Sequence, residues 1–116
     1  MSVPKIAASF YRIAKTYPPS DDEYQTALEK YGPAKPSDSL EVHWARDKWS
    51  LFDTEENARA QAIKRKGRLG GLIVRYDIPV GAGIQWRRTF SATGHYSLWG
   101  DKEELKSYLS DFVAEV

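Results

Sequence analysis

Apolar residues fall into short runs that predict β-strands. The run at 72–78 is apolar enough for a central strand, and a Pro- and Gly-rich turn follows it at 79–83. A run at 40–45 is separated from the next by three charged residues, which predicts one bulged strand or a hairpin. The other runs predicted to be strands are 6–14, 49–52, 84–90 and 95–99. Five or six strands are therefore expected.

Three segments have the spacing and end signals of helices. The first begins after Ser20, which forms a Ser-x-x-Glu capping box with Glu23, and it runs to Tyr31 before Gly32 and a proline end it. The second begins at 53 or 54 and contains alanines that allow close packing. The third follows Asp101, and its apolar stripe consists of Leu105, Tyr108, Leu109, Phe112 and Val113.

This order of elements predicts one α+β domain spanning residues 1–116. We expect a mixed or mostly antiparallel sheet of five to six strands with three helices. A length of 116 residues with 41% hydrophobic content suits a single domain with a single core. The turn-rich segments are too short to separate two domains.

The residue inventory excludes several kinds of site. The chain contains no cysteine, which excludes disulfides, a thiolate nucleophile and a zinc site built on thiolates. The two histidines, His43 and His95, have no acidic cluster nearby in the sequence, so we expect no metal site. Neither a dinucleotide-binding G-x-G-x-x-G, a Walker A sequence nor a nucleophile elbow is present.

Charge and hydropathy give no overall preference for nucleic acid or membranes. The net charge is +1, and no apolar run approaches the length of a membrane span. The N-terminus lacks the basic and then apolar pattern of a signal peptide. We therefore expect a soluble, cytoplasmic protein.

Three segments follow one another in an informative order: Phe10-Tyr11-Arg12, then Trp49 to Thr54 leading into an Ala-rich helix, then Gly71 to Pro79. This order resembles the core of ADP-ribosyltransferase-like domains. In that family an Arg or His near the end of the first strand holds NAD. A Ser or Tyr on a later strand, just before a helix, positions the nicotinamide ribose, and a glutamate on a late strand orients the ribose for transfer.

The resemblance implies an ADP-ribosyltransferase-like fold with NAD as substrate, and it assigns roles to four residues. Arg12 would hold the pyrophosphate, for which a guanidinium offers bidentate hydrogen bonds. Ser50 would contact the nicotinamide ribose. Tyr96 or Trp49 would stack on the nicotinamide ring. The implied cleft lies between the first strand, the Ser50 strand and the strand at 95–99.

The family's glutamate would fall in the strand at 95–99, which contains none. Glu103 and Glu104 come later, in the last predicted helix. The resemblance therefore implies that His95 or Asp101 takes over this task, with His95 assisting the acceptor or the ribose. The implied activity is transfer of ADP-ribose to a protein or nucleic-acid acceptor.

Aromatic and basic residues indicate a second class of function, a non-catalytic module that binds protein or nucleic acid. The four tryptophans lie in predicted strands and could stack on bases. Between Arg46 and Arg88 the chain has ten Lys or Arg against five Asp or Glu. The basic residues assigned to phosphate contacts in this hypothesis are Lys64, Arg65, Lys66, Arg87 and Arg88.

A third hypothesis concerns the histidines. His95-Tyr96-Ser97 matches the H-x-[ST] motif of two-histidine phosphoesterases, which use one histidine as base and another as acid. The second histidine, in His43-Trp44-Ala45, lacks the hydroxyl residue of that motif. Both histidines lie on predicted strands, so the facing pair that this hypothesis requires is geometrically possible.

Overall fold

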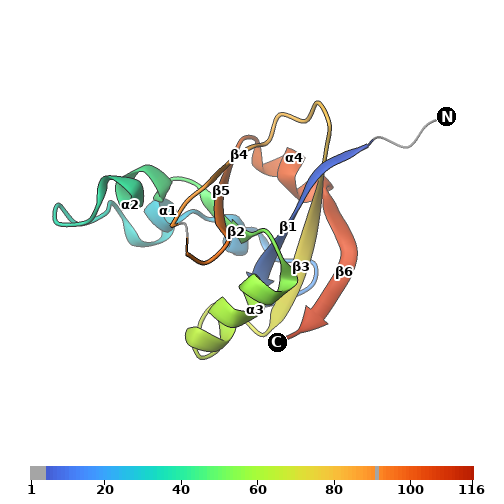
Figure 1. Ribbon diagram of the computed structural model, residues 1–116, viewed down its shortest axis with the longest axis horizontal. Helices are drawn as coiled ribbons and strands as arrows, with labels where there is room; N and C mark the ends of the chain where they lie inside the picture. Colours follow the sequence, from blue (N-terminus) through green and yellow to red (C-terminus); the bar gives the residue numbers. More distant parts are fainter. Residues whose placement is uncertain (1–4, 91) are drawn as a thin grey trace.

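The computed structural model describes residues 5–90 and 92–116 of the chain. Its strands form one antiparallel sheet in the order β4-β5-β2-β1-β3-β6 (Figure 1). The predicted α+β class with a mostly antiparallel sheet is therefore confirmed. The strands are β1 (Ile6–Ala14), β2 (Trp49–Phe52), β3 (Leu72–Pro79), β4 (Gln85–Arg88), β5 (His95–Trp99) and β6 (Leu109–Glu115).

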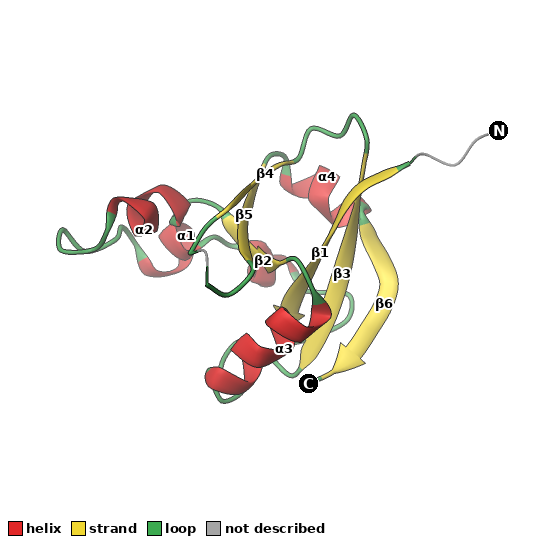
Figure 2. Cartoon of the chain, in the orientation of Figure 1, coloured by secondary structure: helices red, strands yellow, loops and turns green. Residues whose placement is uncertain are grey.

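Short helices connect β1 to β2, β2 to β3 and β5 to β6. Figure 2 shows α1 and α2 in an arm that extends beyond the sheet, whereas α3 lies against the sheet. Among the described residues, no helix is long and apolar enough to cross a membrane. The helices are the 3-10 helix η1 (Asp21–Tyr24) and the α-helices α1 (Ala27–Tyr31), α2 (Leu40–Ala45), α3 (Glu55–Lys64) and α4 (Lys102–Ser107).

The sheet has two differently covered faces, because successive residues of a strand point to opposite sides. We call them the α3 face and the α4 face after the helices that cover them (Figure 1). On the α4 face, Phe10, Leu51 and Tyr76 pack with Tyr24 of η1 and Leu105 of α4. The core of the α3 face is smaller and consists of Phe52, Ala58 and Ile73, with Tyr11, Ile13 and Phe112 packed against it.

The prediction of a strand at 40–45 is wrong, because this segment forms α2. Ser39 caps the helix, and its Oγ accepts a hydrogen bond from the Val42 amide at 3.2 Å. Leu40, Glu41 and Ala45 favour helix intrinsically. The helical turn brings Trp44 to Trp99 of β5, with 5.4 Å between the ring centroids.

The last predicted helix is too long. It ends at Ser107, and the residues from Leu109 onward form the edge strand β6. From Asp111 to Glu115, exposed and half-buried side chains alternate, as expected for a strand with one covered face. The extra strand pairs with β3. Without it, one hydrogen-bonding edge of the buried strand β3 would be unpaired.

The first predicted helix is divided in two. Its start forms η1, and Thr26 then caps α1, where Thr26 and Glu29 make a second capping box. The chain thus has a 3-10 helix and four α-helices within its described part, where three helices were expected. Strand β4 is shorter than the predicted 84–90.

Candidate functional site

The three strands that the predicted cleft requires are neighbours in the sheet, in the order β5-β2-β1. Ser50 of β2 lies opposite Ser97 of β5, and Phe52 lies opposite His95. On its other side, Phe52 lies opposite Tyr11 of β1. Segments far apart in the sequence therefore meet where the resemblance places its site.

The predicted site residues divide between the two faces of the sheet. Tyr11 and Phe52 belong to the core of the α3 face. Ser50 and His95 share this face, because Ser50 is two residues from Phe52 and His95 lies opposite it. Arg12 follows Tyr11 and points to the α4 face, as do Trp49 and Tyr96. The structure does not bring Arg12 together with Ser50 and His95.

Arg12 attaches η1 to the sheet. Its Nη2 donates a hydrogen bond to the Glu23 carbonyl, and its Cζ lies 5.2 Å from the centroid of the Tyr24 ring. Its Nη1 is buried and has no hydrogen-bond partner among residues 5–90 and 92–116. The Tyr24 hydroxyl in turn meets the Tyr76 hydroxyl of β3 at 2.7 Å. These contacts assign the guanidinium to the packing between η1 and the sheet.

Trp49 and Tyr96 are also part of the α4-face packing. Trp49 is 7% exposed, and its Nε1 donates to the Tyr24 carbonyl at 2.7 Å. The Tyr96 ring lies 5.1 Å from the ring of Phe10. The two rings predicted to stack on nicotinamide therefore contact other core side chains.

A row of polar side chains crosses the α3 face. Ser50 of β2 lies opposite Ser97 of β5, and Ser97 lies opposite Arg87 of β4. Ser50 and Arg87 are exposed, whereas Ser97 is buried. We call these three residues the polar row. Neighbouring strands lie about 4.8 Å apart, so about 10 Å separates the backbones at the two ends of the row.

His95 lies beside the polar row in apolar surroundings. Its Nδ1 lies 2.6 Å from the Thr89 hydroxyl, which is itself 3.0 Å from the Ser97 hydroxyl. The rings of Phe52 and Phe90 are 5.5 and 5.0 Å from the imidazole. Burial lowers the pKa of His95 to about 4, and the charge of Glu41 on α2 opposes this shift. The imidazole is therefore neutral near pH 7.

A cluster around Trp44 adjoins the polar row. Arg87 Cζ lies 4.9 Å from the Trp44 ring centroid, and Lys48 Nζ lies 4.1 Å from it. Lys48 also donates hydrogen bonds to the Trp44 carbonyl and to Asp47 Oδ1, both at 2.8 Å. We call Trp44, Trp99, Lys48 and Arg87 the tryptophan cluster.

The sequence prediction missed the tryptophan cluster because it read 40–45 as a strand. The available signal was Ser39 at a capping position before a run of helix formers. A helix at 40–45 accounts for the position of Trp44 above β5. The contact between Arg87 and the Trp44 ring depends in addition on the pairing of β4 with β5.

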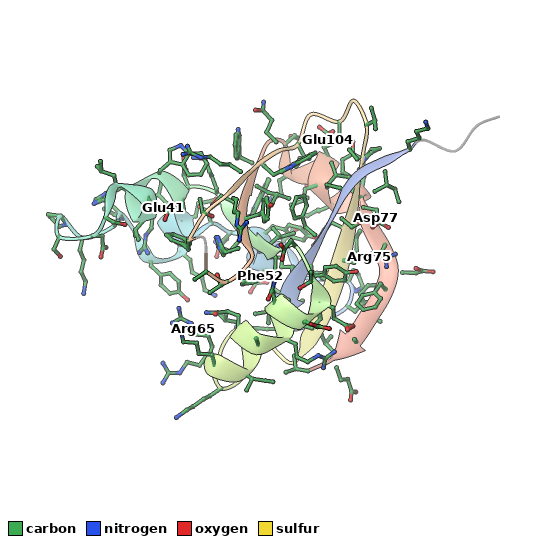
Figure 3. The ribbon with its side chains drawn as sticks, viewed as in Figure 1. Glu41, Phe52, Arg65, Arg75, Asp77 and Glu104 are labelled. Carbon is green, nitrogen blue, oxygen red and sulfur yellow. The ribbon has the colours of Figure 1, made fainter. Side chains whose placement is uncertain are left out.

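The basic residues predicted to contact nucleic acid come from two separate elements. Lys64 ends α3, and Arg65 and Lys66 follow it directly. Figure 3 shows Arg65 at the end of α3. Arg87 and Arg88 lie on β4 and, as neighbours in a strand, point to opposite faces. These cations therefore do not form one continuous surface.

The two histidines do not form the pair that a two-histidine phosphoesterase needs. His43 lies on helix α2, and the expectation that both histidines occupy strands is wrong. His43 is exposed, whereas His95 is buried against Phe52 and Phe90. Within residues 5–90 and 92–116, no three acidic or histidine side chains gather as metal ligands would.

Comparisons with protein-family models, with curated proteins and with solved structures find no match to this chain.

Proposed function

We propose that the protein is an ADP-ribosyltransferase-like domain that binds NAD on the α3 face and transfers ADP-ribose to a protein or nucleic-acid acceptor. One observation carries the proposal. The strands holding the residues singled out by the resemblance are neighbours, in the order β5-β2-β1, and Ser50 and His95 share one face of them. Arg12 lies on the other face and is not part of the proposed site.

Ser50 suits contact with a ribose. Its side chain is exposed, although it lies in a strand whose other residues are buried. A hydroxyl both donates and accepts hydrogen bonds, as the ribose hydroxyls do. The hydroxyls of Ser97 and Thr89 are buried and hydrogen-bond to each other beside Ser50, so of these three hydroxyls it is Ser50 that a ligand can reach. The Ser50 hydroxyl provides orientation without adding charge.

The proposed transfer breaks the glycosidic bond between nicotinamide and ribose C1′. The acceptor's lone pair forms the new bond to C1′, nicotinamide leaves with the electron pair of the old bond, and the acceptor's proton passes to a base. In β5 no glutamate is present. Asp101 is occupied as the cap of α4, where its Oδ2 accepts from the Glu104 amide at 2.9 Å. His95 shares a face with Ser50 and is neutral near pH 7, so its proposed role is to accept a hydrogen bond that orients the acceptor, whose proton then passes to a base in the solvent.

The proposal is tested by titrating NAD into isotope-labelled protein and following backbone amide shifts. We expect saturable shifts around Ser50, Ser97 and His95. Replacing Ser50→Ala removes one hydrogen bond, so we expect affinity to fall roughly fivefold. Ser37→Ala, at an exposed loop serine, is the matched control and should leave affinity unchanged. Absence of any response at millimolar NAD would overturn the proposal.

Two further measurements separate binding from chemistry. Arg12→Ala should lower the stability of the fold by roughly 1–3 kcal/mol, because the Glu23 carbonyl of η1 loses a charged hydrogen-bond donor. The same substitution should leave the NAD dissociation constant unchanged. Release of free nicotinamide from NAD, in the presence of protein or nucleic acid, tests the transfer step. NAD binding without nicotinamide release would refute the transferase part of the proposal.

A further inference from the structure

We propose that Arg87 holds the pyrophosphate of the dinucleotide, at an anion subsite built on the indole of Trp44. This inference depends on the proposed function, because it identifies the anion anchor of the same site. It gives Arg87 the role that the sequence resemblance assigns to Arg12.

The position of Arg87 is the first reason. It lies at the end of the polar row, on the same face as Ser50 and one strand beyond Ser97. Two strand spacings of about 4.8 Å separate it from Ser50. A ribose together with its attached phosphates can cover this distance. A ligand whose ribose contacts Ser50 can therefore direct its phosphates toward Arg87.

The orientation of Arg87 is the second reason. Its guanidinium lies over Trp44, with Cζ 4.9 Å from the ring centroid. A guanidinium held over a ring face by a cation–π contact keeps N–H groups that the ring does not use, and these can donate in pairs to phosphate oxygens. Trp44 is itself held by its contact with Trp99 and by Lys48. This contact with Trp44 restricts the arginine before a ligand arrives, which lowers the entropy cost of binding.

Charge is the third reason. Arg59 pairs with Glu55, Arg75 with Asp77, and Lys48 with Asp47. In the part of the chain that the structure describes, no carboxylate lies within 4.0 Å of the Arg87 nitrogens, and no hydrogen bond uses them. Arg87 is also exposed. An anionic ligand can therefore reach it without first displacing a carboxylate.

The test compares NAD, inorganic pyrophosphate and nicotinamide riboside, which carries no phosphate, by calorimetry with the full chain. Arg87→Ala should weaken NAD and pyrophosphate about tenfold or more, and leave the riboside unchanged. Arg87→Lys should give an intermediate loss, because it keeps the charge but not the planar donor pair. Arg68→Ala removes an equal charge from an exposed loop residue and is the matched control. Trp44→Leu removes the ring that holds the Arg87 guanidinium, so it should also weaken pyrophosphate binding.

The outcomes separate this inference from the proposed function. NAD binding that is equal in the wild-type protein and in Arg87→Ala would overturn the Arg87 assignment alone. If NAD fails to bind the wild-type protein, the proposed function fails, and the pyrophosphate titration then shows by itself whether Arg87 binds the anion. A single-stranded oligonucleotide that competes at Arg87 more strongly than NAD, with a steep dependence on salt, would overturn the dinucleotide assignment.

Discussion

The imidazole of His95 lies in surroundings that oppose its protonation. Burial lowers the pKa in the folded protein to about 4, from 6.5 for a solvated histidine. Between these values the unfolded chain binds a proton that the folded protein does not. The contribution of His95 to the free energy of unfolding is complete above pH 6.5 and is lost as the pH falls toward 4. Its full size is about 3 kcal/mol at most.

This pH dependence can be isolated by comparing variants. We expect the free energy of unfolding, measured with urea from pH 7.5 to 4.5, to fall less steeply in His95→Gln than in the wild-type protein. The glutamine removes the proton uptake in the unfolded chain. His43→Gln replaces the exposed histidine of α2 and should keep the wild-type slope. Equal slopes for the wild-type protein and His95→Gln would contradict the argument.

Single residues also show what the sequence could predict. The alternation within β2 indicates that Trp49 and Ser50 point to opposite faces, and the structure agrees. The pairing of Tyr11 with Phe52 determines which side chains of β1 share a face with Ser50 and Phe52 of β2. No local sequence pattern encodes that register. Arg12 was therefore predicted on the correct strand, but the structure places it on the face opposite Ser50.

Strand β6 is the element for which sequence and structure differ most, and the difference can be measured. Phe112 packs edge to face on Tyr11, with 5.6 Å between centroids, and lies 5.4 Å from Arg75 Cζ. Val113, the next residue, is 43% exposed. Phe112→Ala should cost about 2 kcal/mol of stability, whereas Val113→Ala should cost well under 1 kcal/mol. Thermal or urea unfolding of both variants measures this difference.

A continuous helix would give a different result. On the predicted helical stripe, Phe112 and Val113 both face the core, and both truncations would then be costly. Similar losses in the two variants would contradict the strand. The sequence could not distinguish a helix from a strand here, because the apolar positions from Leu105 to Val113 fit a helical period. The strand forms only where β3 offers an edge for pairing. By contrast, β2, α3, β3 and β5 were predictable from their own composition and end signals.

The sheet as a whole consists of two halves that meet at a short seam. Strands β1 and β3 stay paired from Ile6 opposite Pro79 to Ala14 opposite Leu72, whereas β1 and β2 meet at Tyr11 opposite Phe52. Helix α3 packs across this seam, where Ala58 joins Phe52 of one half and Ile73 of the other. The residues proposed to contact the ligand, Ser50, His95 and Arg87, belong to the half formed by β4, β5 and β2.

This division predicts unequal local stability. Native-state hydrogen exchange should give lower opening free energies for amides of β4 and β5 than for those of β1 and β3. The half that contains β4 and β5 has shorter strands, and its edge strand β4 is fully exposed. A ligand bound by Ser50 and Arg87 stabilises only conformations in which β2, β5 and β4 remain paired. Saturating NAD should therefore raise protection in that half and leave β3 nearly unchanged. Equal opening free energies throughout the sheet would show that the seam does not divide the molecule, and a ligand effect centred on β3 would place the ligand elsewhere.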